Sequence, residues 1–179
     1  MKTELVSLIG IVVVFAATML NLIFTLRNTK KTTFTGSVTS SRIRYIQDIR
    51  EAISKFCGLA YSYNAGLGKF SAQEASAIRK ESDSLRYLIR LYLNPEDKYW
   101  DNKIMLFCDE VIKNTDKGID DLHSAIENLV VITQYLLKLE WQGIKEEAKS
   151  GVLSEKQKKL LYDSYVTLYE NHIAGRKRA

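Results

Sequence analysis

His123 follows Asp120 by three residues, which places the two side chains on one face of a helix. An imidazole and a carboxylate at this spacing can bind a metal ion or exchange protons, because histidine titrates near neutral pH. A complete metal site needs further ligands from other helices, and the chain has only one other histidine, His172. Ordinary surface or capping roles explain the pair better, so we expect no metal and no cofactor.

A basic cluster follows His172 near the end of the last expected helix. A cation suits the negative end of a helix, and clustered lysine and arginine attract the phosphates of anionic lipid or RNA. We expect a solvated basic tail here, with anionic lipid or RNA as the alternative binding partners. The residues of this cluster are His172, Arg176, Lys177 and Arg178.

The sequence lacks the motifs common to nucleotide-binding proteins and hydrolases. It contains no G-x-x-x-x-G-K-[ST], no G-x-G-x-x-G, no H-E-x-x-H and no G-x-S-x-G. Cys57 and Cys108 are the only cysteines, too few for a disulfide framework and without the nearby histidines of a zinc site. We interpret both as core thiols, and we expect a protein that is not an enzyme.

Residues 5–26 form an apolar run without any charged residue. A helix of this length spans ~33 Å at ~1.5 Å per residue, enough to cross the roughly 30 Å hydrocarbon core of a bilayer. The run ends at Arg27 without the small-residue cleavage site of a signal peptide. We therefore expect a retained transmembrane anchor within residues 1–30 and one further domain at 31–179.

Basic residues are distributed unequally around this run, and the whole chain of 179 residues carries a formal net charge of +5. Lys2 is the only basic side chain before the run, whereas five follow it closely. The positive-inside rule then places the N-terminus outside and residues 31–179 in the cytoplasm. The expected location is a bacterial inner membrane, crossed once.

The small and polar residues of the apolar run fall on one side of a helical wheel. At ~100° per residue they occupy a stripe roughly 100° wide, which we call the polar stripe. An amide in lipid without a hydrogen-bond partner is costly, so the stripe predicts contact with further copies of the chain or with water that they surround. Alternatively, the Asn21 side chain extends to the lipid headgroups at the membrane surface and needs no protein partner. The polar stripe consists of Ser7, Gly10, Val14, Ala17, Thr18, Asn21 and Thr25.

The rest of the chain shows helical periodicity and no strand-like alternation. A polar connection at 30–38 precedes the N-cap residue types at 39–41, after which apolar residues recur every three or four positions up to Ala60. One proline among 179 residues also favours long helices. We expect an all-α fold, in which one N-terminal transmembrane helix precedes a cytoplasmic bundle of four to five helices.

Further start signals divide this bundle. Ser71 with Glu74, and Ser154 with Gln157, have the spacing of capping boxes. Pro95 after Asn94 is typical of the first turn of a new helix. We expect the remaining helix to run from residue 119 to about 148, and the last one to end before residue 175.

The layout resembles the small membrane accessory protein of type VI-B CRISPR systems. The similarity lies in chain size, one N-terminal span, the threonine-rich connection, the helix TSSRIRYIQDIR at 39–50 and an all-helical part related to HEPN domains. The resemblance implies a ring-shaped homo-oligomer that forms a pore and depolarises the inner membrane. It also implies a partner, an RNA-guided effector that targets phage RNA in antiviral defence.

HEPN ribonucleases carry an arginine and a later histidine with four to six residues between them, and this sequence does not. Residues 116–118 before His123 are Asp-Lys-Gly, and residues 165–167 before His172 are Tyr-Val-Thr. The main hypothesis is therefore a homo-oligomeric pore without ribonuclease activity. The alternatives are a membrane-tethered binding module that recruits a cytoplasmic partner, and a divergent HEPN nuclease that reuses His172 and Arg176.

Overall fold

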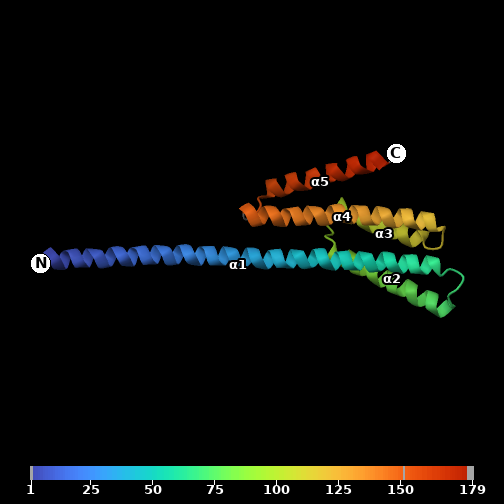
Figure 1. Cartoon of the computed structure of the whole chain (residues 1–179), viewed down its shortest axis with the longest axis horizontal. Helices are drawn as coiled ribbons and strands as arrows, with labels where there is room; N and C mark the ends of the chain where they lie inside the picture. Colours follow the sequence, from blue (N-terminus) through green and yellow to red (C-terminus); the bar gives the residue numbers. More distant parts are fainter. Residues whose placement is uncertain (1, 151, 177–179) are drawn as a thin grey trace. The chain divides into compact units, whose positions relative to one another are not determined.

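The chain folds into α-helices, as a computed structural model shows (Figure 1). The structure describes the backbone of residues 2–150 and 152–176, and the side chains of 14–26, 36–149 and 152–176. All regular structure in these ranges is helical, which confirms the all-α class. The helices are α1 (Lys2–Ala65), α2 (Ala72–Tyr92), α3 (Trp100–Asn114), α4 (Ile119–Ser150) and α5 (Glu155–Arg176).

The chain divides into two compact units, Met1–Ser40 and Ser41–Ala179, and α1 contributes to both. The expected break in α1, with a polar connection followed by a new helix at 39–41, is wrong. No proline interrupts this stretch, and a Cβ at Gly36 would meet no atom. Continuing a helix over threonine costs a few tenths of a kcal/mol per residue, whereas starting a new helix carries the cost of nucleation.

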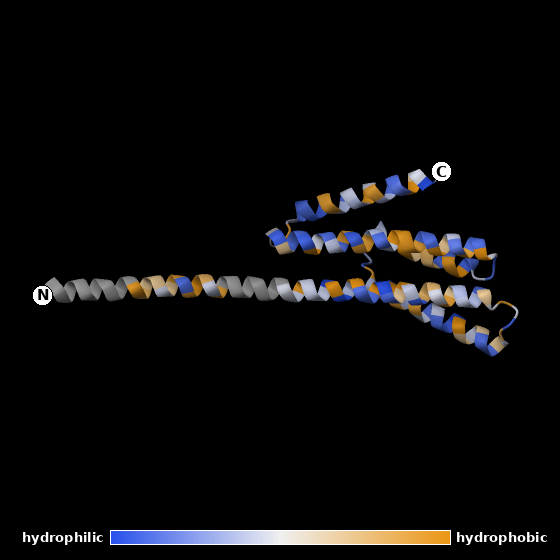
Figure 2. Cartoon of the chain, viewed as in Figure 1, coloured by the Kyte–Doolittle hydropathy of each residue, from blue (hydrophilic) through white to orange (hydrophobic). Residues whose placement is uncertain are grey.

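The apolar run of α1 does not support a membrane crossing. Among the residues whose side chains the structure describes, no helix has an apolar stretch long enough to span a bilayer. Figure 2 shows the hydropathy of the described part of the run, residues 14–26. The expected transmembrane helix, and with it the expected single-pass location in an inner membrane, is therefore wrong. Residues 5–13 of the expected span lie outside the described side chains.

The second unit has one hydrophobic core, to which the last 25 residues of α1 and all of α2 to α5 contribute. The predicted apolar face of α1 is confirmed, since Ile49, Ile53 and Phe56 are buried. α3 packs against α4, α4 against α5, and α2 against α3. The side chains at the centre of the core are Trp100, Phe56, Ile49, Ile89, Ile104, Leu122 and Leu129.

Both predicted capping boxes are confirmed. At the start of α2, Ser71 N donates to Glu74 Oε2 over 2.8 Å, and Glu74 N donates to Ser71 Oγ over 3.3 Å. At the start of α5, Ser154 N donates to Gln157 Oε1 over 2.9 Å, and Gln157 N donates to Ser154 Oγ over 3.4 Å. These reciprocal bonds satisfy backbone donors that the first turn of a helix leaves free.

The expected helix start at Asn94 and Pro95 is wrong by five residues, because α3 begins at Trp100. Asn94 instead holds a turn, in which Glu96 N donates to its side-chain oxygen over 3.1 Å. Tyr99 is the N-cap residue of α3 and makes no side-chain capping bond. The Oδ1 atom of Asp97, two residues earlier, accepts from Tyr99 N at 2.9 Å and from Trp100 N at 3.0 Å, and these bonds fix the turn that leads into α3.

The two cysteines are core thiols, as predicted. Both are free, with Cys108 fully buried and Cys57 partly buried. Burial raises the pKa of Cys57 to about 11 and that of Cys108 to about 12. A thiol with such a raised pKa holds little of the reactive thiolate at neutral pH.

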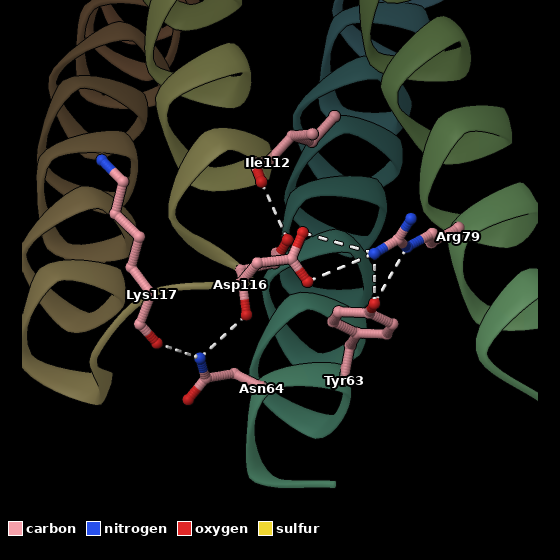
Figure 3. Close-up of polar contacts among 7 residues, drawn as sticks. Tyr63, Asn64, Arg79, Ile112, Asp116 and Lys117 are labelled. Carbon is pink, nitrogen blue, oxygen red and sulfur yellow. Dashed lines mark hydrogen bonds and ion pairs between the residues drawn. The ribbon is translucent and has the colours of Figure 1, made fainter. Parts of the chain in front are cut away.

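The C-terminal end of α1 is tied to the connection between α3 and α4 (Figure 3). The Asn64 amide donates to the backbone oxygens of Thr115 and Lys117, both at 2.8 Å. Beside it, Arg79 of α2 donates to the hydroxyl of Tyr63 over 2.9 Å and forms an ion pair with Asp116 at 3.2 Å (Figure 3). These bonds hold α1 next to α2 and next to the residues that precede α4.

Candidate interaction surfaces

A groove separates α1 and α4 within the second unit. The two helices run antiparallel, because Arg42 of α1 contacts Glu147 near the end of α4, while Asn64 contacts residues just before α4 begins. Between these two ties lies a cavity of about 620 Å³. It is lined by Ile43, Ile46, Gln47 and Arg50 of α1, and by Gln134, Leu137, Lys138 and Trp141 of α4.

The α1–α4 groove combines an apolar floor with polar edges. Ile46 and Leu137 are buried at its base, and Trp141 leaves 44% of its surface exposed. The two cations of the lining, Arg50 and Lys138, are exposed, and no acidic residue lines the groove. A third cation lies close by, since Lys145 Nζ is 5.7 Å from the centroid of the Trp141 ring. The groove can therefore bind a ligand that is apolar on one side and negatively charged on its flanks.

Arg50 and Lys138 differ from other cations at the helix junctions of this unit. Within the part of the chain that the structure describes, neither has an ion-pair partner. Some other cations of this unit pair with a carboxylate from a different segment. These pairs are Arg42–Glu147, Arg79–Asp116, Arg86–Asp109, Lys103–Glu170 and Arg176–Glu127.

A buried polar junction lies next to one end of the groove. Arg42 Nη1 donates to Glu147 Oε2 over 2.8 Å, and the Glu147 side chain is only 8% exposed. Burial raises the pKa of the neighbouring Glu140, while the positive charge of Arg42 lowers it. Burial also raises the pKa of Tyr45, with a further contribution from the negative charges of Asp101 and Glu140. A single arginine thus balances two carboxylates at this junction.

Asp101 is a second buried acid in this region. It accepts a hydrogen bond from the backbone nitrogen of Asn94, which favours the charged form, but burial outweighs this bond and raises the pKa of Asp101 to about 6. An unfolded aspartate titrates near pH 3.9. The native state therefore holds its proton more tightly, and this contribution to stability is present below about pH 4 and is lost as the pH rises through 6.

We expect the Asp101→Asn variant to lose this pH dependence, since asparagine keeps an acceptor for Asn94 N and cannot ionise. Relative to the variant, the original chain should lose about 2 to 3 kcal/mol of unfolding free energy between pH 4 and pH 7. Urea unfolding of both proteins across this range measures the difference, in which the titration of shared groups cancels. A constant difference at all pH values would contradict the prediction.

The two histidines contact different tyrosine rings. The His123 ring stacks on Tyr61 with centroids 5.6 Å apart, and His172 lies against Tyr135 at 5.8 Å. Arg176 forms an ion pair with Glu127 of α4 at 3.0 Å, which joins α5 to α4. Arg176 is thus part of a helix junction, and Lys177 and Arg178 lie outside the described residues.

A hollow of about 670 Å³ beside this ion pair brings together residues that the sequence does not pair. His123 and Arg176 both line it, whereas His172, which the nuclease hypothesis combines with Arg176, does not. Asp120 is not part of the lining either. The hollow is lined by His123, Ser124, Ile126, Glu127, Asn128, Ile173 and Arg176.

The polar stripe lies partly within the described side chains. Ser7 and Gly10 fall outside them, whereas Val14, Ala17, Thr18, Asn21 and Thr25 are exposed on α1. The Thr18 hydroxyl donates to the backbone oxygen of Val14 over 2.8 Å, so it is satisfied within its own helix. Within the described ranges, the Asn21 amide has no hydrogen-bond partner.

All residues of α1 between 14 and 26 are exposed, and Figure 2 shows that most of them are hydrophobic. The large apolar side chains of this stretch, which we call the apolar segment, expose between 44% and 69% of their surface. They are Val14, Phe15, Met19, Leu20, Leu22, Ile23, Phe24 and Leu26. The sequence predicted the apolar character of this segment and its one polar side, and the residues of both are exposed.

The sequence did not predict the α1–α4 groove. Leu137 and Trp141 follow the helical period of α4, which predicts that both side chains belong to the core. Leu137 is buried, but Trp141 is 44% exposed. The available signal was a matched spacing, because the lining residues stand at i, i+3, i+4 and i+7 on both helices. That spacing marks a groove only once the two helices are known to face each other.

No protein family, characterised protein or solved structure matches this chain.

Proposed function

We propose that this protein is a self-assembling helical binding module. The apolar segment of α1 associates with the same segment of further copies, and each copy contributes one bundle, formed by the second unit, for binding a partner protein. The observation that carries the proposal is the exposure of large apolar side chains on every side of α1 between residues 14 and 26.

The energy for assembly comes from covering this surface. Burying one large aliphatic or aromatic side chain stabilises a complex by about 1.5 to 3 kcal/mol, and the apolar segment exposes eight of them. Contiguous apolar surface of this kind marks an interaction site. One partner helix covers only one stripe, whereas a helix that is apolar nearly all round is buried on all sides. Several copies, which carry identical segments, meet this requirement.

The polar stripe sets the orientation of the copies. Its small residues, such as Ala17, let helix backbones approach closely, and the Asn21 amide can donate to and accept from the amide of another copy. A single asparagine in an otherwise apolar helix contact specifies register and the number of helices. The stripe therefore faces the centre of the assembly, with the large apolar side chains packed between neighbouring helices.

Cysteine cross-linking at two adjacent alanines tests this orientation. Ala17 lies on the polar stripe. Ala16 is rotated by about 100° from Ala17 around the helix axis and lies outside the stripe. In a Cys57→Ala background, we expect Ala17→Cys to form covalent dimers under mild oxidation about tenfold faster than Ala16→Cys. Cys108 should not form disulfides under these conditions, because burial raises its pKa to about 12.

Light scattering of the purified chain supplies the independent measurement. The proposal requires a mass of several subunits, and replacing Leu20 and Phe24 by glutamine should reduce it to one subunit. A monomeric mass for the unchanged chain, or equal oxidation rates at the two alanines, would refute self-assembly through the apolar segment.

The proposal keeps the expected self-association and leaves out the membrane pore, which depended on the transmembrane helix. The resemblance to the accessory protein of type VI-B CRISPR systems supports one partner, an RNA-guided effector, and a role in antiviral defence. Purified effector and purified chain should then form a complex on a sizing column. Separate elution would exclude this partner and leave the self-assembly proposal standing.

A further inference from the structure

We infer that the α1–α4 groove docks an acidic amphipathic helix of a partner protein. The inference concerns the second unit alone, and it goes beyond self-assembly, because the apolar segment belongs to the first unit. It depends on three properties of the groove, which are its shape, its apolar floor and its charge.

The shape of the groove fits a third helix. Its two walls are antiparallel helices, and each contributes four residues at i, i+3, i+4 and i+7, which is one face over two turns or ~10 Å. An amphipathic helix binds such a groove by inserting its own residues of the same spacing.

The floor of the groove selects apolar side chains. Ile46 and Leu137 are buried at the base, Ile43 is partly buried, and the half-exposed Trp141 stands at the end of the α4 face. Aliphatic floors bind leucine-like side chains, and an exposed tryptophan at the edge of a groove is the residue type that most often dominates binding energy. Single-stranded RNA prefers a row of aromatic side chains on which its bases stack, and this floor offers only one.

The charge of the groove selects acidic flanks. Arg50 on α1 and Lys138 on α4 have no acidic partner among the described residues, and the amides of Gln47 and Gln134 lie in the same lining. A carboxylate that approaches these cations gains charge-assisted hydrogen bonds. Glutamates on both sides of an apolar helix face supply such carboxylates.

Two synthetic peptides and one RNA test the inference on the unchanged chain. The first peptide has about 18 residues, with leucines at i, i+3, i+4 and i+7 and glutamates on both flanks. The second replaces every glutamate by lysine, and the RNA is an oligouridine of about 12 nucleotides. Binding is followed by calorimetry and by the fluorescence of Trp141, since the other tryptophan, Trp100, is fully buried.

We expect the acidic peptide to bind, and the double variant Arg50→Gln with Lys138→Gln to weaken its binding by at least about tenfold. Both replaced side chains are exposed, so the variant should fold normally, as circular dichroism would show. The matched control is Lys156→Gln with Lys159→Gln, which removes the same charge from two exposed positions of α5. This control should bind as tightly as the unchanged chain.

Three results would overturn the inference. They are no binding of the acidic peptide, equal binding by the unchanged chain and the groove variant, and equal binding of the acidic and the basic peptide. Oligouridine binding that the groove variant alone abolishes, without binding of the acidic peptide, would identify a nucleic-acid site instead. The mass of the assembly stays the same in all of these experiments if self-assembly depends on the apolar segment, so the two proposals fail separately.

Discussion

Replacement of Arg42 by alanine is expected to lower the free energy of unfolding by about 3 kcal/mol, because it leaves a buried carboxylate without its cation. Arg42 Nη1 lies 2.8 Å from Glu147 Oε2, and the Glu147 side chain is 8% exposed. Glu140, whose pKa is raised by burial and lowered by Arg42, loses the same positive charge. The buried Glu147 and the partly buried Glu140, whose pKa the charge of Glu147 raises, would then lack this cation.

The loss should shrink in acid. The pKa of Glu140 already lies above its ordinary value in the folded state, and removal of Arg42 raises it further. A raised carboxyl pKa gives stability that is present at low pH and lost as the pH rises. Urea unfolding at pH 5 should therefore show a smaller difference between the original chain and Arg42→Ala than unfolding at pH 7.

Two further variants separate this explanation from a general effect of charge removal. Arg42→Ala combined with Glu147→Gln should recover part of the lost stability, because the second change removes the unpaired charge. Lys55→Ala breaks the exposed pair of Lys55 with Glu51, which are 2.7 Å apart, and should change stability very little. An equal loss in Arg42→Ala and Lys55→Ala would contradict the role of burial.

Replacement of Trp100 by alanine is expected to cost about 4 kcal/mol, the largest effect of any single change discussed for this chain. Trp100 has no exposed surface and meets three tyrosine rings edge-on, with centroids 5.1 Å away at Tyr99, 5.7 Å at Tyr169 and 6.4 Å at Tyr162. Its indole nitrogen has no hydrogen-bond partner in the part of the chain that the structure describes. The loss therefore comes from packing and from the cavity that the ring leaves.

The chain contains a matched control for this change. Trp141→Ala removes the same side chain from a position that is 44% exposed and should cost less than about 1 kcal/mol. Chemical unfolding measures both values, and the remaining tryptophan reports on each variant. Trp100→Ala should keep only the emission of a partly exposed indole, and Trp141→Ala only that of a buried one. Equal losses in stability would show that Trp100 does not organise the core.

The parts of the fold that depend on neighbouring residues were predictable from the sequence. A capping box joins residues three apart, so Ser71 with Glu74 and Ser154 with Gln157 locate the starts of α2 and α5 without any tertiary information. The same holds for the buried face of α1 around Ile53, since the helical period alone decides which side chains share a side.

The incorrect predictions arise where two local signals compete or where a distant residue decides. Residues 39–41 are good N-cap types, but nothing before them ends the helix, so α1 continues. Asn94 is of a capping type, but α3 begins only after the turn at Asp97, whose Oδ1 accepts from the backbone nitrogen of the buried Trp100. Periodicity likewise shows that residues 14–26 have one polar side, but not what covers the others.

The α1–α4 groove could not be predicted from the sequence, for a different reason. Its cations lie on helices almost ninety positions apart in the sequence, so only the antiparallel arrangement of α1 and α4 shows that they share one cavity. The hollow with His123 and Arg176 has the same origin. Sites of this kind depend on long-range packing, which spacing along one helix does not encode.

Arg50 and Lys138 have no acidic partner among the described residues, which makes the groove a locally frustrated region, whereas Arg79, Arg86 and Arg176 each pair with a carboxylate. A screen for heat resistance would favour variants that place a glutamate at Gln47 or Gln134, since the new carboxylate would pair with a cation of the groove. In such variants the new glutamate would take the position that a partner's carboxylate occupies in the proposed complex. Selection for stability and selection for binding therefore act in opposite directions at these two glutamines.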